Sequence, residues 1–278
     1  MVRASIARLG AALVLLMLLA ASSVAGGGSK PEKPAAASTS LTTAAPEILV
    51  MMRRYPDYFG SPWHRDGGIL ERGSLTGDWG GLRNDLVDLG INLDVSLTQV
   101  FQSNVSGGLE SSPGLRYAGS ADYNLSIDTD KLGLWPGGLL ILHGETAMGT
   151  YRAAEDAGSL IPINSDATMP RANDPGLTTL SECYLIQALD PKLLFLAGKI
   201  YAAGLADTSV FANNERTQFL NTSLINNPVL GNFAPYTSLA AAFVWTPDAN
   251  STIAVLALDP WGRPRRAAST PRSARPTA

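Results

Sequence analysis

The chain has 278 residues, of which 45% are hydrophobic and 16% are charged, and the charged fraction is well below the roughly 25% of typical soluble domains. The single cysteine, Cys183, excludes an internal disulfide framework, and the presence of only two histidines argues against a multi-histidine metal centre. The sequence contains no phosphate-binding glycine motif. Neither a metal nor a cofactor is therefore expected. Seven of the 21 Lys and Arg residues lie in the first 25 and last 18 positions, where no acidic residue occurs, and the acidic remainder argues against a nucleic-acid partner.

Residues 1–25 are predicted to be an export signal. Arg3 and Arg8 precede the apolar run from Leu9 to Ala21, which leads to the small residues Ser23-Val24-Ala25. A charged start, an apolar centre and a small-residue exit are the three parts of a secretory signal peptide. The apolar run is shorter than the roughly 20 residues of a spanning helix, and an uncleaved anchor is the alternative. No other run approaches that length, so a mature protein in a membrane would cross it with strands.

Composition divides the rest of the chain into four segments. Residues 26–46 are rich in Gly, Ser, Pro and Ala and are predicted to be a flexible leader. Residues 47–90 form an N-terminal segment with a short helix, and residues 91–258 carry the strands. Residues 259–278 contain Pro and Arg without apolar alternation. This last segment predicts a truncated or frame-shifted product whose tail is foreign to the fold, with a genuine basic tail as the alternative.

A short amphipathic helix is predicted over residues 80–89. Its apolar face is formed by Leu82, Leu86 and Leu89. Arg83 falls on the opposite, polar face. Asp78 is placed to cap the N-terminus of the helix, and Gly90 is placed to end it.

After Gly90 the apolar period changes from 3.6 to 2, which predicts strands with one apolar and one polar face. The predicted strands cover residues 91–98, 117–128, 139–148, 180–188, 193–200, 239–245 and 252–258. The alternation is regular in the first two. The last four are apolar at many consecutive positions, so the pattern does not define their inward faces.

The connections between these strands alternate between long and short. An up-and-down barrel with long loops on one side and tight turns on the other predicts this pattern, and a Greek-key sandwich does not. Trp135 and Trp245 each lie beside a short turn, hence at the same edge of the sheet. That placement is typical of an aromatic girdle at a membrane interface, with ordinary turn packing as the alternative. The predicted fold is therefore an all-β, antiparallel, up-and-down transmembrane barrel.

The string Leu75-Thr76-Gly77-Asp78-Trp79-Gly80-Gly81-Leu82-Arg83 resembles the carbohydrate-selective porins of the OprB family. The resemblance continues through Asp128-Thr129-Asp130-Lys131-Leu132, Trp135-Pro136-Gly137-Gly138, Gly198-Lys199, and Thr217-Gln218-Phe219-Leu220-Asn221 with Asn227-Pro228. It implies an outer-membrane barrel of about 16 strands through which sugars diffuse, with the helix on the periplasmic side. The Gly-Asp-Trp-Gly-Gly residues are interpreted as fold markers that seat the helix. The seven strands predicted over residues 91–258 would make only part of such a barrel.

A sugar-selective pore needs polar side chains of both signs that hold hydroxyls weakly. The polar faces of the predicted strands supply six pore-lining candidates for sugar binding: Glu145, Lys199, Asp94, Asp122, Asn124 and His143. Glu145 and Lys199 come first because they carry opposite charges on strands that are taken to have a defined phase. For each candidate the alternative is a solvated residue without a special role.

The predicted function is therefore passive, carbohydrate-selective diffusion of sugars through a porin of the bacterial outer membrane. The alternative within this prediction is that the chain is a fragment of such a porin and does not conduct. The expected partners are sugars and outer-membrane lipid, with a homo-oligomer left open. No spacing of carboxylates and no nucleophile motif supports an enzyme. An exported soluble β-sandwich that binds saccharides is the alternative function.

Overall fold

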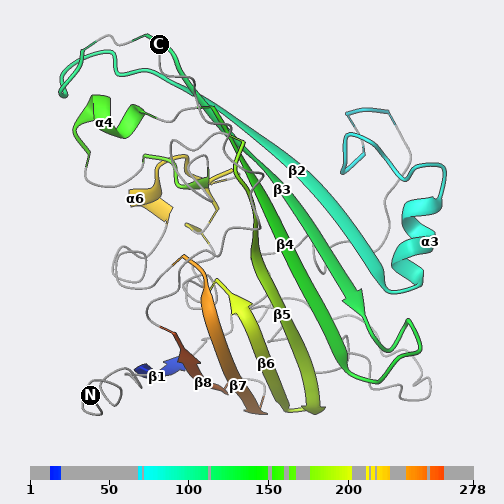
Figure 1. Cartoon of the computed structure of the whole chain (residues 1–278). Helices are drawn as coiled ribbons and strands as arrows, with labels where there is room; N and C mark the ends of the chain where they lie inside the picture. Colours follow the sequence, from blue (N-terminus) through cyan, green and yellow to red (C-terminus); the bar gives the residue numbers. More distant parts are fainter. Residues whose placement is uncertain are drawn as a thin grey trace, which may run out of the picture.

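The structure is a computed structural model of the whole chain. It describes residues 13–19, 68–70, 72–111, 114–149, 152–159, 163–166, 176–201, 211–212, 214–216, 218–225, 236–248 and 251–259. Within these ranges, long antiparallel strands dominate and the helices are short (Figure 1). None of the described helices is both long enough and apolar enough to span a membrane.

Eight strands of the described chain form one sheet. Their bounds are β1 Leu13–Leu19, β2 Ile91–Gln102, β3 Arg116–Asp128, β4 Gly138–Gly149, β5 Thr178–Asp190, β6 Leu193–Ile200, β7 Ser238–Asp248 and β8 Ser251–Leu258. The strands β2 to β8 follow one another across the sheet, each antiparallel to the next, and β1 is added beyond β8 (Figure 1). Because β1 and β2 form opposite edges, the described sheet is open. The seven predicted strands and their up-and-down order are confirmed.

Strand β1 comes from the apolar run that is predicted to be an export signal. Its backbone pairs with β8, from Leu13 opposite Leu258 to Leu19 opposite Thr252. In the uncleaved chain this run therefore extends the sheet by one strand. The signal peptide itself stays a prediction. The predicted leader at residues 26–46 and the tail from residue 260 onward lie outside the described residues.

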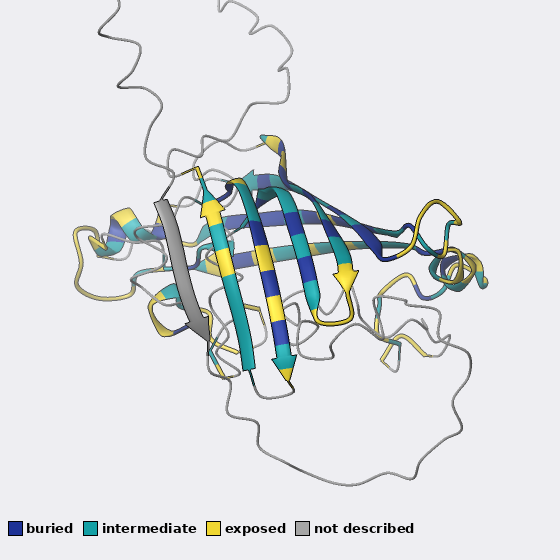
Figure 2. Cartoon of the chain, turned by 90° about the horizontal axis from the view of Figure 1, so that it is seen from below, coloured by how far each residue is buried: buried dark blue, intermediate teal, exposed yellow. Residues whose placement is uncertain are grey.

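Side chains on the two faces of the sheet reverse the usual order of a soluble protein. On β3, Asp122 is 3% exposed, whereas Val95 and Leu97 on the neighbouring β2 are 57% and 63% exposed. The register places further exposed apolar residues on that same outward face: Phe101, Tyr123, Leu180, Leu239, Phe243, Trp245 and Val255. Figure 2 shows buried and exposed residues alternating along the strands. The apolar face of the sheet is therefore its exposed, outward face.

On β4 to β7 the inward face is apolar near the short turns, whereas β2 and β3 carry polar residues such as Asn92 and Ser126 at that level. The apolar cluster is formed by Leu139, Ile141, Tyr184, Ile186, Leu194, Leu196, Ala242 and Val244, and Ile200 extends it along β6. Trp135 and Trp245 lie at this end of the sheet, as predicted, and each is about half exposed. Trp135 donates its indole N–H to Gln187 Oε1 at 2.9 Å, which ties the β3–β4 turn to β5.

The long connections fold over the inward face. They carry the short helices α4 (Ala153–Ala157) and α6 (Thr222–Ile225), which lie on one side of the sheet (Figure 1). Arg116 of β3 donates to the buried Asp156 of α4 at 2.7 Å. The backbone carbonyl of Asp156 in turn accepts hydrogen bonds from Leu109 and Glu110, at 2.9 and 3.0 Å. Helix α4 therefore joins the β2–β3 connection to the wall of the sheet.

Helix α3 (Leu82–Asp88) precedes β2, close to the prediction, but its buried side is not the predicted one. Leu82 and Leu89 are exposed, whereas Arg83 is 4% exposed. Arg83 is buried because its guanidinium bonds the loop before the helix and the start of β2. The N-cap is Gly81, not Asp78; the Asp78 carboxylate accepts a hydrogen bond from the Gly80 backbone N–H at 2.9 Å instead.

Gly90 ends the helix as predicted, with a φ of 91°. A Cβ at this position would lie 2.7 Å from the Cβ of Lys131 and 2.9 Å from the carbonyl oxygen of Asp128. Both the positive φ and this close approach require glycine.

Candidate functional site

The sheet register gathers polar side chains into two rows that cross β2 to β5 on the inward face. One row runs Asp94–Asn124–His143–Glu182 and the other runs Ser96–Asp122–Glu145–Thr179. We call these eight residues the polar belt. Because strand residues alternate between faces, each strand contributes two residues, one to each row. Five of the six predicted site residues belong to the belt, and the sixth, Lys199, does not.

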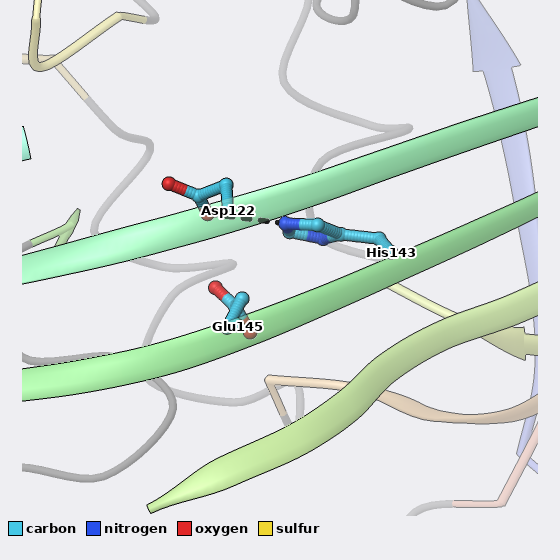
Figure 3. Close-up of side chains that lie close together, drawn as sticks. All are labelled: Asp122, His143 and Glu145. Carbon is cyan, nitrogen blue, oxygen red and sulfur yellow. Dashed lines mark hydrogen bonds and ion pairs between the residues drawn. The ribbon is translucent and has the colours of Figure 1, made fainter. Parts of the chain in front are cut away.

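His143 lies between two carboxylates at the centre of the belt. Its Nε2 is 3.1 Å from Asp122 Oδ1 on β3, and its Nδ1 is 3.3 Å from Glu182 Oε2 on β5. Figure 3 shows Asp122 and His143 facing one another from neighbouring strands, with Glu145 beside them. All four side chains are buried. Two ring nitrogens that both face carboxylate oxygens require a proton, or another cation, on each nitrogen.

Glu145 is held by two hydroxyl groups. Ser181 donates to one of its oxygens, and the Tyr236 hydroxyl donates to the other at 2.6 Å. Ser181 reaches Glu145 because β5 has a bulge: His143 pairs with Glu182, and the next residue, Gly144, pairs with Leu180. Ser181 and Glu182 are consequently both buried on the inward side. A bulge of this kind redirects side chains without ending the strand.

Arg216 lies in the long connection between β6 and β7 and contacts the belt on the inward side of the sheet. It donates to Asp122 Oδ2 at 2.6 Å, to Ser96 Oγ at 2.7 Å and to Asp166 at 2.9 Å. Burial acts to lower the pKa of Arg216, but the hydrogen bonds and charges of Asp166 and Asp122 outweigh this effect. The pKa of Arg216 therefore lies above its ordinary value. Arg216 therefore stays cationic and fastens its connection to β2 and β3.

Glu215, the neighbour of Arg216, fastens the same connection to the β4–β5 connection. Its carboxylate accepts hydrogen bonds from the Ser165 hydroxyl, from the Asp166 backbone N–H at 2.8 Å and from Thr222 at 3.1 Å. Burial raises the pKa of Glu215 despite these donors, which lower it. Two long connections are thus linked to one another over the inward face.

Asp94 has a structural partner outside the belt. Its Oδ1 accepts a charged hydrogen bond from Arg83 of α3 at 2.8 Å. The same guanidinium donates to Ser74 Oγ at 2.7 Å and lies 5.3 Å from the centre of the Trp79 ring. The Gly-Asp-Trp-Gly-Gly string thus shapes the loop that receives Arg83, as expected of a fold marker.

The predicted placement of Lys199 on the pore-lining face is wrong. Lys199 pairs with Cys183 on β5 and with the exposed Leu239 on β7, which places it on the outward, apolar face. Its Nζ donates to the Leu180 carbonyl oxygen at 2.5 Å. The prediction failed because β6 is apolar at nearly every position, so its sequence does not reveal which residues point inward. Glu145 and Lys199 consequently do not form a pair on one face.

The sequence does not predict three residues of the belt, which are Ser96, Thr179 and Glu182, or three residues that contact it, which are Arg216, Tyr236 and Arg83. The phase of β5 concealed Glu182, because the bulge at Ser181 breaks its alternation. Arg216 and Tyr236 belong to a long connection, where no periodic pattern shows which side chains fold back. Arg83 is the last residue of the string that resembles the OprB family, and this resemblance is the sequence feature that could have identified it.

The belt offers two kinds of chemistry. Its carboxylates, hydroxyls, amide and imidazole can accept and donate hydrogen bonds to a polyhydroxylated solute. In addition, Asp122, His143 and Glu145 each present one ligand atom, and these atoms all lie within 4.8 Å of one another. The three residues are therefore able to surround a metal ion.

No protein-family model matches the chain, and no curated protein matches it. Among solved structures, the chain is similar to one described as "High pH structure of Pseudomonas putida OprB", with a TM-score of 0.55 and 18% sequence identity. The similarity covers 66% of this chain and 44% of that one, so this chain spans less than half the length of that protein. At this identity the likeness shows the fold alone, an antiparallel sheet similar to that of the OprB β-barrel.

Proposed function

We propose that this chain forms the wall of an outer-membrane porin through which sugars diffuse passively. One observation carries the proposal: the sheet buries charged side chains on its inward face and exposes large apolar side chains on its outward face. In water this arrangement is unfavourable, because apolar surface stays hydrated. It becomes favourable when hydrocarbon covers the outward face and the inward face lines an aqueous channel.

Strand dimensions and aromatic positions support a membrane location. The strands β2 to β5 have 12 or 13 residues each, enough for the roughly 9 to 11 residues of a tilted transmembrane strand. Two outward-facing aromatic pairs lie at opposite ends of the sheet: Phe101 with Tyr117 beside the long connections, and Phe195 with Phe243 toward the short turns. Aromatic residues at both edges of an apolar band are typical of outer-membrane barrels.

The polar belt suits a neutral, polyhydroxylated solute. Sugars carry no net charge, and they exchange hydrogen bonds with water for hydrogen bonds with the wall at little net cost. The belt provides donors and acceptors at one level of the inward face, with Asp94 and Ser96 its more exposed members and the other six residues buried. Weak contacts of this kind allow passage rather than retention. The proposed activity is therefore transport by diffusion rather than catalysis.

The proposal is tested with full-length protein folded in detergent and inserted into liposomes. We expect the liposomes to swell in isosmotic glucose or arabinose, and protein-free liposomes to stay unchanged. Glu145→Gln, which removes a belt charge, is expected to change the rate for sugars, whereas Glu155→Gln on the exposed side of α4 is not. A failure to swell would overturn the proposal.

The sandwich alternative makes the opposite prediction about fractionation. A soluble saccharide-binding protein would remain in the periplasmic extract without detergent and would bind sugar there. The described strands lie in one sheet and supply no second layer over the apolar face, which supports the porin proposal. We expect the protein in the detergent-extracted outer-membrane fraction.

A further inference from the structure

We propose that Asp122, His143 and Glu145 bind one divalent transition-metal ion within the polar belt. The proposal concerns a second property of the inward face and does not depend on sugar transport. It rests on the donor set, on the balance of buried charge and on the partner of the histidine ring. Zn²⁺ is the ion that these donors fit best, since imidazole and carboxylate ligands both suit it.

The donor atoms are close enough for a small structural change to complete a site. The three ligand atoms lie within 4.8 Å of one another, and Asp122 Oδ1 and His143 Nε2 are already 3.1 Å apart. Ligands at about 2.0 Å from zinc in a tetrahedron are separated by about 3.3 Å. The carboxylate of Glu145 is the group that would move, together with the Ser181 and Tyr236 hydroxyls that donate to it.

The buried charges leave room for a cation. Three buried carboxylates, those of Asp122, Glu145 and Glu182, and the partly exposed carboxylate of Asp166 lie near one guanidinium and one imidazole, and Lys199 adds one positive charge from the outward face. Even a protonated His143 leaves the carboxylates in excess among these described residues. An uncompensated buried carboxylate is unfavourable, so a divalent ion would lower the energy of this cluster.

Glu182 prepares the histidine ring for metal binding. Its Oε2 faces His143 Nδ1 at 3.3 Å, and its other oxygen accepts the Tyr201 backbone N–H at 2.9 Å. A carboxylate beside Nδ1 holds the ring proton there and leaves Nε2 as the ligand atom. Such a carboxylate is the usual outer partner of a zinc-bound histidine. Nε2 is the nitrogen that points toward Asp122.

The carboxylate ligands have fixed outer partners of the same kind. Asp122 Oδ2 is held by Arg216, so Oδ1 remains directed at the imidazole. Ser181 and Tyr236 donate to the two oxygens of Glu145, and each of these oxygens keeps a further lone pair for a metal. These partners would orient the ligands without competing for the ion.

The test is Zn²⁺ titration of full-length, tag-free protein folded in detergent, followed by calorimetry. We expect saturable binding of about one ion per chain. His143→Gln should abolish it, and Glu182→Gln should weaken it by about 10- to 100-fold because only the outer partner is lost. His64→Gln removes the other histidine of the chain and should leave binding unchanged.

X-ray absorption spectroscopy of the unaltered protein tests the site without requiring that any variant folds. The zinc X-ray absorption spectrum should show a single imidazole, with oxygen as the remaining ligands. Absence of saturable binding would overturn the proposal, as would unchanged affinity in a folded His143→Gln protein. A spectrum with two imidazoles or with none would overturn it as well.

Discussion

Arg83 connects three parts of the N-terminal region through one buried guanidinium. It bonds Asp94 and the Leu93 carbonyl on β2, and it bonds Ser74 in the loop before α3. The position is the least exposed in the helix, although arginine is rarely buried unless it is paired. The single residue therefore fixes the orientation of α3 on the sheet.

Arg83→Met is expected to reduce the free energy of unfolding by about 2 kcal/mol, since Asp94 loses its partner while remaining partly buried. Urea titration of the protein folded into phospholipid vesicles measures the change. The matched control is Arg152→Met, whose pair with Glu155 is exposed on both sides and should contribute less than about 0.5 kcal/mol. Equal losses in the two variants would contradict the anchoring role of Arg83.

At the scale of elements, the outward face of β2 tests whether hydrocarbon covers the sheet. Leu97 lies near the middle of this strand and is exposed. Leu97→Arg is expected to destabilise the vesicle-inserted protein by about 2–4 kcal/mol, because arginine at the bilayer midplane is costly. In water the same exposed substitution would change stability by less than about 0.5 kcal/mol. Leu109→Arg, in the exposed β2–β3 connection, serves as the control and should be neutral.

Helix α4 is expected to respond to acid through Asp156. The Arg116 guanidinium holds the pKa of the Asp156 carboxyl below its ordinary value, chiefly by a direct hydrogen bond. Because the folded pKa is the lower one, this carboxylate stabilises the anchored helix above about pH 4, and the contribution is lost as the pH falls through the lowered pKa.

Hydrogen exchange over residues 152–159, corrected for intrinsic rates, measures this loss. Protection in the unaltered protein should decrease between pH 6 and pH 3. Asp156→Asn should be poorly protected at both values. If both proteins behave alike, Asp156 does not anchor α4.

The elements differ in how far sequence predicts them. The polar and apolar residues of β2 and β3 alternate regularly, so both faces follow from the period alone, although β2 continues four residues past the predicted end at Thr98 to Gln102. The same reasoning fails on β6, where apolar residues on both faces conceal the outward direction of Lys199, and on β5, where the Ser181 bulge shifts the phase. The five belt residues among the candidates were predictable because they stand on regular stretches. Arg216 and Tyr236 reach the belt from a loop, and loop contacts depend on tertiary packing that no local period encodes.

At the scale of the whole molecule, two long connections lie over the inward face and are linked to the sheet and to one another. Arg216 links the β6–β7 connection to β2 and β3, and Glu215 links it to the β4–β5 connection. Under the proposed function, these links hold a constriction in place. Releasing them should therefore matter more for large solutes than for small ones.

Arg216→Gln is expected to raise the entry rate of a trisaccharide relative to glucose by about twofold or more in liposome swelling, since the constriction loses its charged fastening. Arg152→Gln, on an exposed pair, provides the control for altered net charge. An unchanged ratio of the two rates would indicate that the β6–β7 connection does not limit passage.

The extra residue at Ser181 allows β5 to lose one residue without turning its faces over. Glu182 lies inward and Leu180 lies outward on either side of Ser181, and these are the directions that adjacent residues of a regular strand take. Deleting the Ser181 codon would therefore restore regular alternation and leave Thr179 inward and Leu180 outward. The shortened chain would lose the hydroxyl that donates to Glu145, so a lost triplet at this point should resemble a Ser181→Ala replacement rather than a slip of the whole strand.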